Sequence, residues 1–230
     1  MLRKKELPDK LISAPDSNEV FNSISHGAGA LLALAGGILL VVLSAVRSKP
    51  IHLVSFAIYG TFLFLSLLSS TLLHSFLAFG RYKRILGILD HAAIYLLIAG
   101  TFIPICLVVI GGFWGIALLS AVSAAALALM LIKSFAFSRL GKAYSIISYL
   151  SLGWAGVVAG ALAYGKVGLL PLAVFLLGGL LYTVGSIIFF TGKPNPFPPV
   201  FGSHEIWHSF VLAGNSVFYF SMLFFILPLG

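Results

Sequence analysis

The chain of 230 residues is 60% hydrophobic and only 9% charged, with 14 Lys and Arg residues against 6 Asp and Glu residues. A soluble domain needs a larger polar fraction to cover its surface, so this composition excludes an ordinary globular protein and predicts an integral membrane protein. We interpret the net charge of +8 as a topology signal and an attraction to anionic lipid, and no nucleic-acid partner is expected.

A polar segment over residues 1–22 precedes the apolar part of the chain, and we expect it to form a short cytoplasmic tail. Residues 23–230 are expected to form one transmembrane domain. A helix needs about 20 apolar residues to cross a bilayer, and runs of that length predict an all-α bundle of seven transmembrane helices. The runs cover residues 26–46, 51–74, 85–110, 113–132, 143–164, 168–190 and 204–228. The first run is too long for a signal peptide.

The basic residues predict the orientation of this bundle. Eleven of the 14 lie at the ends of segments on the N-terminal side, and only Arg47, Lys49 and Lys166 lie on the other side. Because cytoplasmic loops carry the excess of Lys and Arg, the N-terminus is expected inside and the C-terminus outside. Cys106 is the only cysteine, so no internal disulfide can form, and its mid-span position predicts a small buried apolar side chain.

The connections favour a compact bundle. Residues 47–50, 111–112 and 165–168 are short enough to join antiparallel neighbours. The connection from Lys193 to Ser203 contains four prolines, which predict a stiff, extended approach to the seventh span. Gly156 and Gly160 are four residues apart in the fifth span and predict a face for close helix packing.

Polar residues gather where alternating spans reach one side of the membrane. The seventh run begins with His204 and His208, which share a helix face because they are four residues apart. His74 ends the second run one turn after Ser70, and Asp90 lies near the start of the third run. Side chains of this kind are costly in lipid and usually mark a site, so we expect them to converge near the cytoplasmic interface.

Three histidines with one open position are the ligand set of a catalytic zinc ion, which turns a bound water into a nucleophile. His74, His204 and His208 are therefore the expected ligands. The dipole at the start of the seventh helix disfavours imidazolium, which keeps His204 able to bind metal. Asp90 can accept a proton from the water, and Ser70 can bind the water or a substrate carbonyl.

Other interpretations remain open. His204 and His208 also fit an HExxH pattern, in which Glu205 would be the general base of a protease-like site. Paired histidines can ligate haem or face lipid headgroups, and imidazoles also bind copper and nickel. His91 points about 100° away from Asp90 around the helix, so a structural role is expected for it. His52 is expected at the opposite interface.

The motifs together resemble the hemolysin III branch of the progestin and adiponectin receptor family. The resemblance covers nearly the whole chain and preserves motif order; its segments are Asn22-Ser23-Ile24-Ser25-His26-Gly27, Ser70-Thr71-Leu72-Leu73-His74, Leu89-Asp90-His91-Ala92 and His204-Glu205-Ile206-Trp207-His208. It implies seven spans, zinc held by His74, His204 and His208, and Asp90 holding the zinc-bound water. Glu19 matches an acidic residue that the family carries before its first span, and with His26 it is expected at the cytoplasmic mouth.

Family members are discussed as lipid-amide hydrolases, receptors, haemolysins or regulators of membrane lipid state. The leading hypothesis is a zinc-dependent, ceramidase-like hydrolase of a lipid amide or ester, with a membrane lipid as its substrate. The second is a lipid or stress sensor in which zinc ties helices together. A pore-forming cytolysin is the third, and it is disfavoured because the outer half of the spans offers few polar residues to line a pore.

Overall fold

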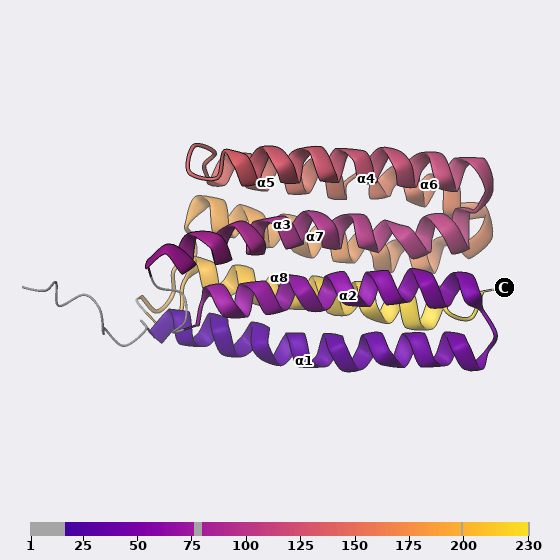
Figure 1. Ribbon diagram of the computed structural model, residues 1–230, viewed down its shortest axis with the longest axis horizontal. Helices are drawn as coiled ribbons and strands as arrows, with labels where there is room; N and C mark the ends of the chain where they lie inside the picture. Colours follow the sequence, from indigo (N-terminus) through magenta and orange to yellow (C-terminus); the bar gives the residue numbers. More distant parts are fainter. Residues whose placement is uncertain (1–16, 76–79, 199, 230) are drawn as a thin grey trace, which may run out of the picture.

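The computed structural model describes residues 17–75, 80–198 and 200–229. Within them, seven helical spans are long and apolar enough to cross a membrane, which confirms the expected fold class. The spans are α1 (Ser17–Val46), α2 (Pro50–Leu73), α3 (Gly80–Pro104) with η2 (Ile105–Ile110), α4 (Gly112–Phe135), α5 (Lys142–Gly153) with α6 (Gly156–Val167), α7 (Leu169–Thr191), and α8 (Ser203–Ser221) with η3 (Met222–Ile226). Successive spans run in opposite directions (Figure 1).

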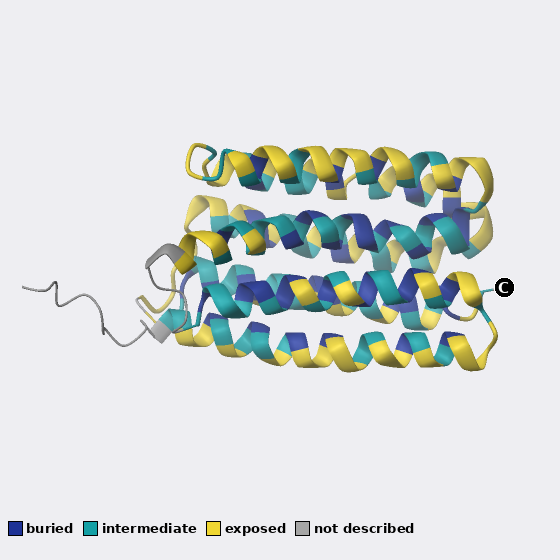
Figure 2. Ribbon diagram, in the orientation of Figure 1, coloured by how far each residue is buried: buried dark blue, intermediate teal, exposed yellow. Residues whose placement is uncertain are grey.

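The spans pack in chain order, and α8 closes the ring by contacting α1. Buried residues are most frequent on α2 and α3 (Figure 2). The close approach of α1 and α2 depends on Gly37 and Gly60, because a Cβ atom on Gly60 would lie 3.0 Å from the Cα atom of Gly37. The expectation of a packing face at Gly156 and Gly160 was wrong. A Cβ atom on Gly156 would meet nothing within 4 Å, and one on Gly160 would meet only a leucine methyl group at 3.8 Å.

Three spans change conformation along their length. Pro104 ends α3 and lacks the backbone N–H that a helix interior needs, and the wider π turns of η2 follow it. A second π segment, η3, follows α8. The predicted fifth span is interrupted, since a turn at Trp154 and Ala155 separates α5 from α6. Apolar length alone cannot reveal such a break.

The short connections were predicted correctly, and the long one was not. Gly111 and Gly168 have φ values of 64° and 75°, which glycine adopts without steric cost. Between α7 and α8, Phe197 and Phe201 exchange two backbone hydrogen bonds of 2.9 and 2.8 Å. These bonds bring Phe197 and Phe201 together, so the part of the connection nearest α8 is not extended. The ring of Phe201 packs on Phe21 of α1 at 5.2 Å between centroids.

The two ends of the bundle carry different polar residues. α2, α4 and α7 end where α1, α3, α5 and α8 begin (Figure 1), and we call this the histidine end. At the opposite end, the ammonium of Lys49 in the α1–α2 turn donates hydrogen bonds to the carbonyls of Leu227, Pro228 and Leu229, at 3.2, 3.2 and 2.7 Å. This contact ties the segment after η3 to the first turn of the ring. The orientation of the bundle in a membrane stays a prediction.

Candidate metal centre

Three imidazoles from two helices meet at the histidine end. His74 follows the last turn of α2, and His204 and His208 lie one turn apart at the start of α8. One ligand atom from each lies within 4.8 Å of the others. His74 and His208 are buried, and His204 is partly exposed. The structure therefore brings together the three residues that the sequence selected.

The geometry of this cluster fits a metal ion. The Nε2 atoms of His204 and His208 are 3.2 Å apart. Two nitrogen ligands of one tetrahedral zinc ion, each about 2.0–2.1 Å from it, lie about 3.3 Å apart. The group can hold a metal ion, whose identity the donor set leaves open.

A carboxylate on α1 holds His74 in place. The Nδ1–H of His74 donates to the carboxylate of Glu19, which leaves the Nε2 atom free to bind a metal. Metal-binding histidines commonly donate their second nitrogen to a carboxylate, which fixes the tautomer and the ring orientation. The sequence placed Glu19 at the mouth of the site but did not assign it this contact. The available signal was an acidic residue about two turns before the first apolar run.

Ser70 and Asp90 lie beside the cluster. The hydroxyl of Ser70 forms a 2.8 Å hydrogen bond with Nδ1 of His26 on α1, and it faces the carboxylate of Asp90 on α3. The rings of His26 and His208 are 4.0 Å apart between centroids. Asp90 and Ser70, expected to serve catalysis, thus lie with the three predicted ligands on the wall of one cavity. Their catalytic roles remain predictions.

Glu205 forms structural hydrogen bonds, whereas the HExxH pattern would make it a general base. One of its carboxylate oxygens accepts the backbone N–H of Gly202 at 2.7 Å, and the other accepts the side-chain amide of Asn22 at 3.0 Å. The first bond caps the start of α8, where N–H groups lack helical partners. The second bond ties α8 to α1. Glu205 is buried and both of its oxygens are engaged, so it is a poor general base.

The other two histidines lie outside the cluster. His91 donates its Nδ1–H to the carbonyl of Gly87 one turn earlier, at 2.9 Å, and its ring packs on Phe137. These contacts agree with the expected structural role, although the same nitrogen also lies 3.8 Å from the Asp90 carboxylate. His52 is buried in the first turn of α2 at the opposite end of the bundle, against Phe56.

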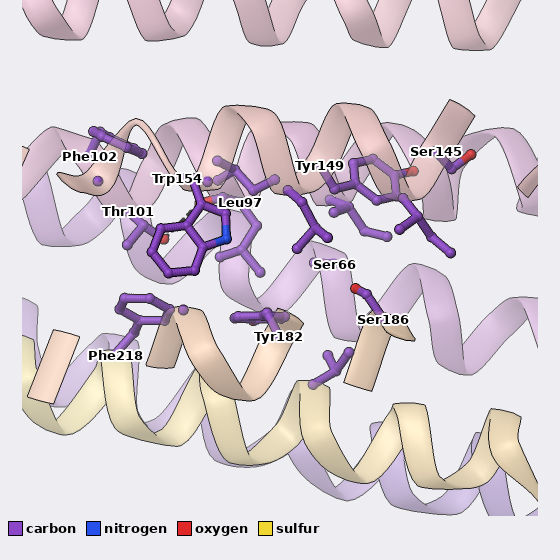
Figure 3. Close-up of a pocket in the computed structure, with 18 of the residues that line it drawn as sticks. Ser66, Leu97, Thr101, Phe102, Ser145, Tyr149, Trp154, Tyr182, Ser186 and Phe218 are labelled. Atoms are coloured by element: carbon purple, nitrogen blue, oxygen red, sulfur yellow. Dashed lines mark hydrogen bonds between the residues drawn. The ribbon is translucent and has the colours of Figure 1, made fainter. Parts of the chain in front are cut away.

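The cluster opens on a cavity of about 810 Å³ that runs along the bundle. The cavity lies between α3, α5, α6, α7 and α8, and apolar side chains form most of its wall. Figure 3 shows the wall midway along, where the indole of Trp154 projects into the space between the helices. Its Nε1–H donates to the hydroxyl of Thr183 on α7 at 3.1 Å. Gly153, Gly156 and Gly179 also line the cavity, which explains why their Cβ positions are open.

Known proteins are similar to this chain over most of its length. The profile of the family described as "Haemolysin-III related" matches residues 16–219. The chain is 38% identical to the Hemolysin-3 of Bacillus cereus over 210 residues, which cover 91% of this chain and 92% of that protein. It is 39% identical to a Hemolysin-3 homolog of Bacillus subtilis (strain 168) over 207 residues, covering 90% and 93%. The match to the family profile spans α1 to α8 and includes every residue of the histidine cluster, so the chain belongs to the haemolysin-III related family.

Proposed function

We propose that this protein is a zinc-dependent hydrolase of lipid amides or esters, embedded in a plasma membrane with its N-terminus inside. One observation carries the proposal: three imidazoles that can hold a metal ion lie, with Asp90, on the wall of a large apolar cavity. Apolar pockets with a few convergent polar groups are the usual form of a site for a lipid-like ligand. The cavity would hold the acyl chain, and its histidine end would hold the scissile bond.

His74, His204 and His208 would hold the zinc ion, which when bound supplies a Lewis acid and makes a nearby water more acidic. Asp90 would orient the attacking water and accept its proton. Ser70 would lie beside the substrate carbonyl, and a proton on Nδ1 of His26 would be donated to the Ser70 oxygen and leave the Ser70 hydroxyl proton for that carbonyl. In amide hydrolysis the C–N bond breaks, the water oxygen joins the acyl carbon, and the proton held by Asp90 passes to the leaving nitrogen.

The structure favours an enzyme over a pore. The relatives are named as hemolysins, but a water-filled channel needs polar groups along its length. The wall of the cavity is mostly apolar beyond the histidine end. A sensor in which zinc only joins α2 to α8 uses the same three histidines, so the test must separate the binding of metal from turnover.

The test measures zinc content and released fatty acid on the same purified protein, with a panel of long-chain lipid amides and esters. We expect about one zinc per chain in the wild type. His204→Ala/His208→Ala should lack it, whereas Asp90→Asn should retain it. Asp90→Asn should hydrolyse at least about 100-fold more slowly, the usual scale for loss of a general base. Stoichiometric metal in the double variant would refute the site, and metal without turnover in the wild type would favour the sensor.

A further inference from the structure

Two lysines, Lys133 and Lys142, line the histidine end of the cavity. Lys133 on α4 is only 4% exposed, and its ammonium donates to the carbonyl of Leu140 at 2.6 Å. Lys142, the first residue of α5, is exposed at the cavity rim and donates to the carbonyl of Phe189. Neither forms an ion pair among the described residues 17–75, 80–198 and 200–229. Each ammonium keeps donors beyond the one used by its carbonyl.

Within residues 17–75, 80–198 and 200–229, the three acids at this end already have partners. Glu19 accepts from His74, and Glu205 accepts from Gly202 and Asn22. Asp90 faces Ser70. A buried ammonium such as that of Lys133 is normally compensated by an opposite charge. Apart from aromatic rings such as that of Phe137, whose centroid lies 5.0 Å from the Lys133 ammonium, no group in the described part of the chain balances the positive charge on the cavity wall.

Lys142 is joined to the metal centre through one aromatic ring. Its ammonium lies 3.6 Å from the centroid of the Phe189 ring, and that centroid lies 5.2 Å from the centroid of the His204 ring. The ammonium is thus within about 9 Å of the His204 imidazole. If the scissile carbonyl of a lipid lies at the histidines, a group a few bonds away in its headgroup can reach this ammonium.

We infer that the substrate is a lipid with an anionic headgroup, and that Lys142, supported by Lys133, binds its carboxylate or phosphate. The inference rests on the proposed function and names its substrate class. N-acylglycine has the required form, because a single carbon separates its amide nitrogen from its carboxylate. N-acylethanolamine carries the same amide and chain with a neutral hydroxyl in place of the acid. Selectivity between these two lipids reports the contribution of the lysines.

The experiment measures binding first, so that it does not depend on turnover. Unlabelled N-palmitoylglycine and N-palmitoylethanolamine displace a fluorescent N-acylglycine from purified protein in neutral detergent, and Kd values are obtained for each. We expect the wild type to prefer the acid by about 10-fold or more, the scale of one charge-assisted hydrogen bond. Lys142→Gln should abolish most of this preference, and Lys142→Arg should retain it.

Arg139→Gln is the matched control, because Arg139 lies in the α4–α5 connection, three residues before Lys142, and is exposed but does not line the cavity. It should leave the preference unchanged. Equal affinity of the wild type for both lipids, or an equal loss of preference in Arg139→Gln, would overturn the inference. Displacement of the probe by inorganic phosphate alone at comparable affinity would also overturn it, since the ligand would then be a small anion.

Hydrolysis of the same two lipids separates this inference from the proposed function. Turnover of both at equal rates, with equal affinity, would support the hydrolase and refute the role of Lys142. Selective binding of the acid without turnover of either would refute the hydrolase and leave an anionic-lipid site. Zinc content should stay the same in Lys142→Gln, because this residue is no ligand.

Discussion

Replacing Glu205 distinguishes a structural carboxylate from a catalytic one. Its two hydrogen bonds, to Gly202 N–H at 2.7 Å and to the Asn22 amide at 3.0 Å, are buried. A hydrogen bond to a charged group contributes roughly 1.5–3 kcal/mol, so Glu205→Ala should cost about 3–6 kcal/mol. At roughly 2–4 °C per kcal/mol for a chain of this size, the melting temperature should fall on the order of 10 °C.

Glu205→Gln should be far milder, for a reason visible in the structure. The Oδ1 atom of Asn22 is buried without a hydrogen-bond partner among the described residues. If the amide of Asn22 rotates by 180°, this oxygen can accept from the new glutamine NH₂, while the glutamine oxygen still accepts from Gly202. Both bonds are then kept as neutral ones, and the cost should be about 1 kcal/mol.

The assay is thermal unfolding in detergent, with zinc content and lipid-amide hydrolysis measured on the same samples. Glu205→Gln should retain zinc and most of its activity. Asn22→Asp is the matched control, because it sets two carboxylates against each other and should destabilise strongly. If Glu205→Gln lost turnover while it kept zinc and its melting temperature, Glu205 would be the base and the protease-like interpretation would replace ours.

Three further predictions follow from other contacts. Glu19→Gln should weaken zinc binding by roughly 10- to 100-fold, because the partner of His74 loses its charge; competition with a chelating dye measures this, and an unchanged Kd would contradict it. In a cysteine-free background, a thiol at Ser48 should react with an impermeant reagent outside intact cells and one at Asn195 should not, whereas the reverse pattern would invert the proposed orientation. Trp154→Phe should remove the hydrogen bond from the α5–α6 break to α7 and widen the spin-label distance distribution between them, and an unchanged distribution would show that the bond does not hold them.

The features that could be predicted from the sequence are those that depend on local patterns of residues. Span number follows from apolar length, and the pairing of His204 with His208 follows from helical spacing. Topology alone then brings His74 to the same end. The contact of Glu19 with His74 and the burial of Lys133 were not predictable, because both depend on how separate helices rotate about their axes.

Two predictions from local patterns were wrong. Gly156 and Gly160 satisfy a packing pattern, yet they line the cavity, where a Cβ atom would meet little or nothing. The prolines before α8 predicted an extended strap, but the paired Phe197 and Phe201 close a turn against α1. In the first case no neighbouring helix lies close enough to use the pattern, and in the second a local backbone pairing and a contact with α1 outweigh the preference of proline for an extended chain.

The hydrogen bonds of Lys49 join segments that are far apart in the order of synthesis. Its ammonium sits in the first loop, and its acceptors are the carbonyls of residues 227–229. Because these acceptors follow the seventh span in the chain, the contact can form only after that span has been made. Until then α1 also lacks its contact with α8, so the ring of helices is still open on that side.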